Sequence, residues 1–196
     1  MFRIKKTPLK QQTDEELFVN ICKGNSDAFG ELYNRFSNRL LYYFYRMLGN
    51  DKALSQDFMQ ELFYKIIEKP YLFDPQRRFS TWIFSVAHNM CKNEYRSKEV
   101  RKIVVKNDNM DGFYQNDLEY ADKEKIVNAI FEELESFDES HRTAFLLKYR
   151  EGFNLEEIGE TLNLPIGTVK SRLFYTRKKL QEILSDKYAE TIENLF

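Results

Sequence analysis

The sequence predicts an all-α protein made of two helical domains joined by a flexible linker. Apolar residues recur at helical spacing along most of the chain, and only 7 glycines and 4 prolines interrupt its 196 residues. The segment 106–121 breaks this pattern, because it is polar and rich in turn-forming residues. We therefore expect a disordered N-terminus over 1–12, a first domain over 13–105, a linker over 106–121 and a second domain over 122–196.

Four helices are predicted in the first domain. Each begins with a Ser, Thr or Asp, which are typical helix N-caps, and the first three end near a glycine or a proline. The expected spans are 13–24, 26–49, 51–68 and 80 to between 98 and 103, with a loop over 70–78. Ser80 is the expected cap of the long last helix, and Thr13 has capping-box spacing to Glu16.

The second domain ends in a helix-turn-helix pattern. After helical segments on either side of 136–138, Asn154 is placed to cap a short helix ending near Leu162, and a tight turn with Pro165 follows. A longer helix is predicted from Ile166 to Leu184. Its expected apolar face carries Ile166, Val169, Leu173, Thr176 and Leu180, and its opposite face carries Thr168, Ser171, Phe174, Tyr175 and Lys178, with Lys170 at the margin.

Charge is distributed unevenly between these two helices. The stretch 165–180 holds five Lys or Arg residues and no acid, whereas the short helix before it carries three glutamates. A helix with one apolar and one basic face is what a DNA recognition helix requires, because it docks on its neighbours and meets the major groove. The alternative is a helical hairpin whose basic face is merely solvated.

The overall charge limits how the chain meets DNA. Its formal net charge is −1, from 30 basic and 31 acidic residues, whereas a stand-alone DNA binder usually carries a positive field. DNA contacts should therefore be confined to particular faces. No apolar run approaches the roughly 20 residues of a spanning helix, and no signal-peptide core is present, so we expect a cytoplasmic protein without membrane insertion.

The reactive side chains do not suggest a catalytic or metal site. Cys22 and Cys91 give no disulfide framework and no zinc spacing, and both are expected to be buried thiols. His88 lies three residues before Cys91, but no second pair accompanies them. Without a glycine-rich phosphate loop or a plausible nucleophile–base pair, we expect neither an enzyme nor a cofactor.

The C-terminal motif resembles region 4 of bacterial RNA polymerase sigma factors of the extracytoplasmic-function (ECF) type. The segments 154–162 and 165–173 read Asn-Leu-Glu-Glu-Ile-Gly-Glu-Thr-Leu and Pro-Ile-Gly-Thr-Val-Lys-Ser-Arg-Leu. The resemblance implies that the last helix reads the −35 promoter element as duplex. It implies base-facing roles for Thr168, Lys170, Ser171, Phe174 and Tyr175, and phosphate contacts for Arg172 and Lys148.

The segment 57–63, Asp-Phe-Met-Gln-Glu-Leu-Phe, resembles region 2.2 of the same family, which grips the clamp helices of the largest polymerase subunit. Asp57, Gln60 and Glu61 share one helix face at i, i+3 and i+4, so they are the expected polymerase-binding residues. A solvated helix face is the alternative. The family often has an acid just before this aspartate, where the present chain has Leu54-Ser55-Gln56.

The loop 72–79 and the helix 80–89 resemble regions 2.3 and 2.4, which hold the melted −10 strand. Captured bases need pockets and aromatic stacking, and the strand needs cations along its backbone. Phe73 and Asn89 are expected to line a flipped-base pocket, and core packing is the favoured reading of Trp82. The predicted −10 residues are Phe73, Arg77, Arg78, Trp82, Asn89, Lys92 and Arg96.

The resemblance implies a transcription initiation factor that places core RNA polymerase on promoters through its −35 and −10 contacts. Implied partners are the polymerase clamp helices and flap region, promoter DNA and an anti-sigma factor. The alternative is a stand-alone helix-turn-helix regulator with an N-terminal dimerisation or sensing domain, which would bind paired half-sites tightly by itself. Two interpretations of the acidic linker stay open. By the resemblance, it passes through the polymerase toward the RNA exit path; otherwise it acts only as a tether.

Overall fold

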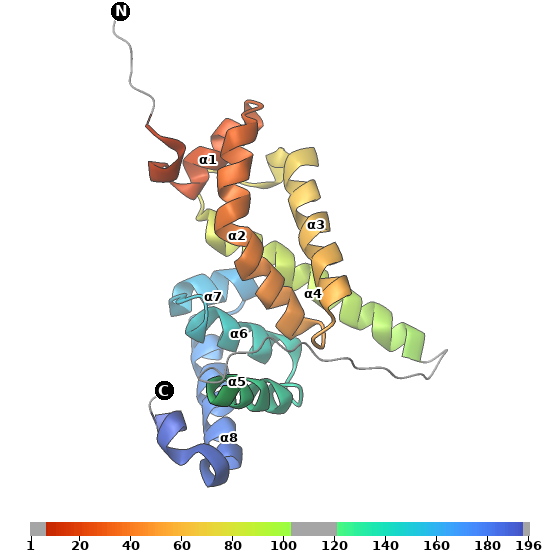
Figure 1. Ribbon diagram of the computed structural model, residues 1–196, viewed down its shortest axis with the longest axis vertical. Helices are drawn as coiled ribbons and strands as arrows, with labels where there is room; N and C mark the ends of the chain where they lie inside the picture. Colours follow the sequence, from red (N-terminus) through yellow and green to blue (C-terminus); the bar gives the residue numbers. More distant parts are fainter. Residues whose placement is uncertain (1–6, 103–120, 194–196) are drawn as a thin grey trace, which may run out of the picture.

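A computed structural model describes residues 7–102 and 121–193, and these ranges contain eight α-helices, two short 3₁₀ helices and no strand (Figure 1). The all-α prediction is confirmed, and the predicted linker lies outside the described residues except for Ala121. The helices are η1 (Leu9–Gln11), α1 (Asp14–Cys22), α2 (Ser26–Met47), α3 (Lys52–Glu68), η2 (Pro70–Leu72), α4 (Phe79–Lys102), α5 (Ala121–Leu134), α6 (Glu139–Tyr149), α7 (Leu155–Leu162) and α8 (Ile166–Glu193).

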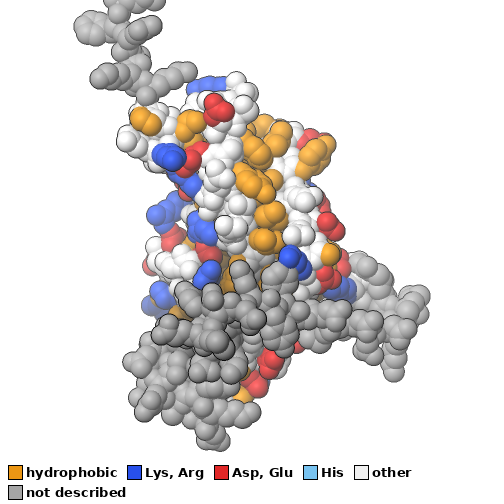
Figure 2. All heavy atoms as spheres, viewed as in Figure 1, with side chains coloured by type: hydrophobic (Ala, Val, Ile, Leu, Met, Phe, Trp, Pro, Cys, Tyr) orange, Lys and Arg blue, Asp and Glu red, His pale blue; other side chains and the backbone are white. Residues whose placement is uncertain are grey.

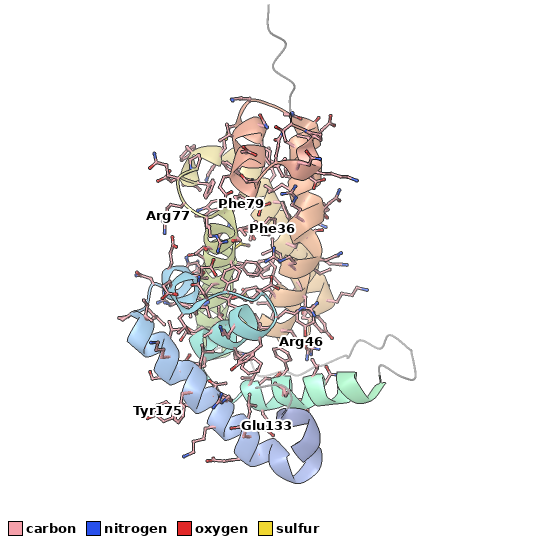
Figure 3. All side chains as sticks on the ribbon, turned by 90° about the vertical axis from the view of Figure 1, so that its left-hand side faces the viewer. Phe36, Arg46, Arg77, Phe79, Glu133 and Tyr175 are labelled. Carbon is pink, nitrogen blue, oxygen red and sulfur yellow. The ribbon has the colours of Figure 1, made fainter. Side chains whose placement is uncertain are left out.

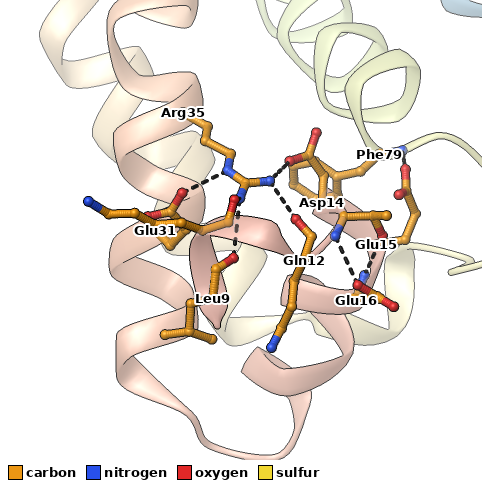
Figure 4. Close-up of polar contacts among 10 residues, drawn as sticks. Leu9, Gln12, Asp14, Glu15, Glu16, Glu31, Arg35 and Phe79 are labelled. Atoms are coloured by element: carbon orange, nitrogen blue, oxygen red, sulfur yellow. Dashed lines mark hydrogen bonds and ion pairs between the residues drawn. The ribbon is translucent and has the colours of Figure 1, made fainter. Parts of the chain in front are cut away.

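The N-terminal segment is more ordered than we expected. We predicted disorder over 1–12, but residues 7–12 are described and include η1, while 1–6 lie outside the described residues. The guanidinium of Arg35 in α2 accounts for this order, since it donates to backbone carbonyls of this segment and pairs with Asp14 at 2.8 Å and Glu31 at 2.9 Å (Figure 4).

Local capping explains where the first helices begin. Thr13 and Glu16 form a complete capping box at the start of α1, as predicted, and Asp51 caps α3 through the Leu54 N–H. The predicted cap of the long helix was wrong. That helix starts at Phe79 rather than after Ser80, and the Phe79 N–H donates to Glu15 of α1 at 2.9 Å (Figure 4).

The first domain is built around α2. Its apolar stripe is fully buried at positions such as Leu32, Phe36 and Leu40, and the helices α1, α3 and α4 pack against it. Aromatic side chains fill the upper part of this core, with the Phe36 and Phe79 rings edge to face at 5.2 Å (Figure 3). Burial of such rings supplies most of the stabilisation of a small helical domain.

In the second domain, α6, α7 and α8 pack together and α5 covers part of α8. The predicted inner face of α8 is correct for Val169, Leu173, Thr176 and Leu180, which are all buried. Ile166 was predicted to be buried on that face, but it is 41 % exposed in the first turn of the helix. A short apolar cluster of Ile130, Leu134, Phe145 and Leu180 joins α5, α6 and α8.

The two domains are packed against each other through α4 with α7 and α2 with α6. One cluster of buried side chains continues from the first domain into the second, and the rings of Phe84 and Phe153 meet across the boundary at 5.5 Å. Sequence periodicity did not reveal this contact. None of the described helices is long and apolar enough to cross a membrane.

Candidate nucleic-acid interface

The turn between α7 and α8 is held by three local features. Asn154 and Glu157 form a capping box at the start of α7, and Asn163 ends that helix in the left-handed conformation with φ of 53°. The chain then folds back tightly, because the Leu164 N–H donates to the Gly159 carbonyl at 2.8 Å. A Cβ atom on Gly159 would lie 2.9 Å from the Leu164 oxygen, so this crossing needs glycine.

This turn leaves the outer face of α8 exposed over most of the residues that we predicted to meet DNA. Lys170 and Ser171 are exposed, and Thr168 is half-buried. The rings of Phe174 and Tyr175 are 55 % and 63 % exposed, and Tyr175 projects from the outer side of the helix (Figure 3). The face therefore brings cationic, hydroxyl and aromatic side chains together.

Arg172 is less available than its neighbours. Its Nη1 lies 3.4 Å from Asp138, which also caps α6 by accepting from the backbone N–H groups of Ser140 and His141. Partial burial opposes ionisation of the Asp138 carboxyl, but hydrogen bonds from the side chains of Ser140 and His141 and from the His141 backbone outweigh it and keep the pKa of that group well below its usual range. Arg172 is thus positioned by the cap of α6, while Lys148 is half-buried near the end of the same helix.

Phe73 does not occupy the position that we predicted. It was expected to line a base pocket with Asn89, but its side chain is 4 % exposed. The ring is enclosed by Phe18, Phe79 and Trp82, at centroid distances of 4.9, 5.2 and 5.0 Å. Such a cluster stabilises the loop before α4, and its packing explains why the ring is turned inward.

The remaining predicted −10 residues lie along α4 and the loop before it. Trp82 is half-buried in the aromatic cluster, in agreement with the core-packing reading. Asn89 and Arg96 are exposed and Lys92 is half-buried. Together they leave a polar and basic face on α4, downstream of the loop that carries Arg77 and Arg78.

Arg77 and Arg78 are exposed, but both are engaged by acids of α7. The Arg77 guanidinium pairs with Glu160, its Nε donating at 2.9 Å, and Arg78 pairs with Glu157 (Figure 3 shows Arg77 beside this helix). Sequence reasoning treated the glutamates of α7 only as a contrast to the basic α8. The glutamates of α7 are visible in the sequence, but the sequence does not show that arginines from the first domain pair with them.

The predicted polymerase-binding residues Asp57, Gln60 and Glu61 are all exposed on α3, and Glu61 pairs with Lys65 at 2.6 Å. Sequence reasoning missed the apolar side chains beside them. Tyr64 and Ile67 continue the Gln60 face at i+4 and i+7, and Tyr71 and Leu72 follow in η2. All four are more than half exposed, and Figure 2 shows hydrophobic side chains gathered over α2 and α3.

The two cysteines differ in exposure, and His88 is buried. We expected both cysteines to be buried, but only Cys91 is, because Cys22 is exposed at the end of α1. His88 is buried beside Thr143 of α6 at 3.1 Å, and desolvation lowers its pKa to about 4. Across the described parts of the chain, no group of three or more His, Cys, Asp or Glu side chains is arranged to hold a metal ion.

Comparison with known families matches two separate segments of the chain. The family model described as Sigma-70 region 2 matches residues 32–101, and that of Sigma-70, region 4 matches residues 134–182. The first segment covers α3, α4 and most of α2, and the second covers the helix-turn-helix. Both halves of the described structure therefore carry a match, in the order expected from their motifs.

Similar proteins extend over nearly the whole chain. The ECF RNA polymerase sigma factor SigW of Bacillus subtilis is 31% identical over 176 residues, which span 85% of this chain and 94% of that protein. The ECF RNA polymerase sigma-E factor of Haemophilus influenzae is 27% identical, spanning 88% and 95%.

Two solved structures share the fold. CnrH in complex with the cytosolic domain of CnrY has a TM-score of 0.67 at 23% identity and spans 90% of this chain and 99% of that one. The sigma factor RpoE of Bartonella quintana, in complex with the anti-sigma factor NepR, has a TM-score of 0.61 at 21% identity and spans 81% and 98%.

Proposed function

The chain belongs to the ECF sigma factors of the sigma-70 family, and we propose how its surfaces divide the work of transcription initiation. It acts as an initiation factor that binds core RNA polymerase and directs it to promoters. The observation that carries this function is the presence of regions 2 and 4 in order within one chain. A stand-alone regulator would need only the helix-turn-helix, so that alternative is not favoured.

We assign −35 recognition to the outer face of α8. Lys170 and Ser171 are exposed, with polar ends that can meet base edges, and Thr168 lies one turn earlier on the helix. Phe174 and Tyr175 supply apolar contact of the kind that thymine methyl groups accept. Arg172 and Lys148 have the charge to hold phosphates, which fix register without reading sequence.

We assign capture of the −10 strand to α4 and the loop before it. Arg77, Arg78 and Arg96 have the exposure and charge to follow a single-stranded backbone, with Lys92 and the Asn89 amide between them on α4. Phe73 would have to leave its aromatic cluster to stack on a base. We therefore assign Phe73 and Trp82 to the scaffold that shapes this loop.

We assign polymerase binding to α3. Asp57, Gln60 and Glu61 form an exposed acidic and polar face that suits a basic partner surface. Tyr64 and Ile67 extend that face with apolar area, and an interface of aromatic and aliphatic anchors beside charged groups is typical of stable association. The acidic residues would select the partner, and the apolar ones would supply affinity.

Three further features complete the proposal. The chain performs no covalent chemistry of its own and acts only as a subunit of the polymerase. Its place of work is the cytoplasm, where the polymerase and the promoter are. An anti-sigma factor is a partner, as it is for the Bartonella quintana protein that shares this fold.

The test is reconstitution. Purified full-length protein is mixed with core polymerase and a library of promoter fragments, and run-off transcripts are mapped to their start sites. We expect transcripts from specific fragments only when the protein is present, and co-elution of the protein with core polymerase. Absence of co-elution, or transcription that does not depend on the protein, would overturn the proposed function.

A further inference from the structure

The loop before α4 carries two of the arginines assigned to the −10 strand, and both ends of this loop are held by α1. At its start, the ring of Phe73 packs edge to face on the ring of Phe18 at 4.9 Å. At its end, the Phe79 ring lies 5.5 Å from the same Phe18 ring, and the Phe79 N–H donates to the Glu15 carboxylate at 2.9 Å (Figure 4). One short helix therefore sets where the loop leaves the core and where it returns.

Glu15 and Phe18 act as one contact surface because they lie at i and i+3, on the same face of α1. Phe18 is 1 % exposed and Glu15 is half-buried. The helix that carries them is itself fixed, because its first turn is closed by a capping box and its length packs on α2. The aromatic contact and the carboxylate are thus presented to the loop in a set geometry.

The Glu15 carboxylate supplies a cap that α4 does not provide for itself. The first N–H groups of an α-helix have no partner within the helix, and this end of the helix attracts negative charge. Phe79 is the first residue of α4, so its N–H is one of these groups. Partial burial raises the pKa of the Glu15 carboxyl, but the hydrogen bond from Phe79, other local hydrogen bonds and the charge of Arg78 lower it below its usual value. The acceptor is therefore an ionised carboxylate, and its charge also acts on Arg78.

The interior of the loop has little freedom of its own. The Asp74 carboxylate accepts from the Gln76 N–H at 3.0 Å, and the Asp74 carbonyl accepts from the Arg77 N–H at 2.9 Å. Arg77 and Arg78 follow this turn directly and are exposed. Because the turn is closed and both loop ends are anchored, a shift of the anchor at Phe79 would displace both arginines.

We propose that α1 is the positioning element of the −10 site and that Glu15 is its positioning residue. By holding the start of α4, Glu15 places Arg77 and Arg78 for the melted strand without touching DNA itself. A binding site that is displaced by about 1 Å loses much of its function, so an anchor outside the site can control it. The inference rests on the proposed role of α4 and its loop. It adds a helix that precedes residues 32–101, the segment that matches Sigma-70 region 2.

The experiment uses holoenzyme made from the full-length chain and core polymerase. The DNA is a promoter fragment identified by the run-off mapping described above, with 2-aminopurine in its −10 element, because this base fluoresces more strongly when it is unstacked. Glu15→Ala should lower the equilibrium constant for promoter opening about three- to tenfold, the order of the net contribution of one hydrogen bond. Glu15→Gln should recover most of this loss, because its amide oxygen can still accept from the Phe79 N–H.

The matched control is Glu31→Ala. Glu31 is also a half-buried glutamate of the first domain, but its ion pair with Arg35, at 2.9 Å, stays within α2. Opening by this variant should equal that of wild type. Two further readouts should stay at the wild-type level in every variant, because α3 and α8 are unchanged: co-elution with core polymerase, and holoenzyme binding to a fragment that carries only the −35 element. Circular dichroism would verify the fold at the assay temperature.

Three results would overturn the proposal. The first is wild-type opening by Glu15→Ala, and the second is an equal defect in Glu15→Gln or in Glu31→Ala. The third is a loss in Glu15→Ala that is equally large for opening, core association and −35 binding, since that pattern indicates general loss of structure. Failure of the proposed function is separate, because wild-type protein would then give no promoter-specific transcription with core polymerase. Normal wild-type transcription with any of the three results would reject only the positioning role of α1.

Discussion

The hydroxyls of Tyr43 in α2 and Thr143 in α6 lie 2.9 Å apart in the buried contact between the two domains, although the residues are 100 positions apart in the chain. The same Thr143 oxygen is 3.1 Å from Nδ1 of His88 in α4. One threonine therefore satisfies polar groups from two helices of the other domain. Because unpaired buried polar groups are costly, this arrangement favours one relative placement of the domains.

Replacing Thr143 with valine should destabilise the protein by about 1–3 kcal/mol, because the Tyr43 hydroxyl and His88 would lose their buried partner. The measurement is chemical denaturation followed by circular dichroism. Thr176→Val is the matched control, since Thr176 is equally buried and its hydroxyl has no hydrogen-bond partner among the residues that the structure describes. That control should be neutral or stabilising, and equal losses in both variants would contradict the role of Thr143.

Stability should fall as the pH is lowered from about 7 to about 5, and His88 should be responsible. Burial is the main cause that lowers the pKa of His88 from 6.5 to about 4. The nearby charges have smaller effects: Glu139 and Asp138 raise this pKa, and Lys92 and Arg172 lower it further. The unfolded chain then binds more protons, so stabilisation present above pH 6.5 is lost progressively toward pH 4. The expected loss is about 2 kcal/mol at pH 5.

The measurement for this prediction is a series of denaturation curves across the same pH range for wild type and His88→Gln. The variant has no titrating group at this position, so its stability should change less with pH even if it is lower throughout. Parallel curves for the two proteins would show that another group is responsible.

Gly159→Ala should disrupt the helix-turn-helix, because the added Cβ would lie 2.9 Å from the Leu164 carbonyl oxygen, a backbone atom that cannot move aside. We expect a loss of about 1–3 kcal/mol, as for other overpacked positions. Gly167→Ala in α8 is the control, since no heavy atom in the described part of the chain, outside this stretch of the helix itself, lies within 4 Å of where its methyl group would sit. The Gly167→Ala variant should gain up to about 1 kcal/mol of stability, because alanine has a higher helix propensity than glycine. Melting temperatures of the two variants would test both expectations.

Lys170→Ala should weaken binding of the holoenzyme to its −35 element. If the side chain reads a base, the loss is about 1–3 kcal/mol and is confined to one position of the site. If the side chain holds a phosphate, the loss of affinity is independent of the DNA sequence. The slope of log affinity against log salt concentration then becomes smaller in magnitude by about one. Footprinting across salt concentrations separates these cases, and unchanged promoter affinity would remove Lys170 from the interface.

Glu61→Lys should reduce association with core polymerase about tenfold or more, since it reverses charge on the exposed face of α3 that is proposed to meet a basic surface. Glu132→Lys makes the same change at an exposed position of α5 and serves as the control. Circular dichroism would verify that both variants fold. Retention of full affinity by Glu61→Lys would place the polymerase contact elsewhere.

Local features of the chain were sufficient to predict most of its helices. The capping boxes at Thr13 and Asn154 and the turn before Pro165 depend on residues within three or four positions of each other. Periodicity likewise identified the buried face of α8, although Ile166, which was predicted to lie on it, is exposed. The motifs in the same segments indicated the family, which the comparisons then established.

The spacing of apolar residues predicts that a helix face is buried, but it does not predict which segment covers that face. Only the tertiary structure shows the covering segment. The aromatic ring of Phe73 could stack on a base as far as the sequence shows, yet in the structure three other rings enclose it. The start of α4 depends on Glu15, 64 residues before it, and Arg77 meets Glu160 across 83 residues. Contacts at such separations arise only when whole helices pack, because side-chain shape and charge from distant segments must fit together at once.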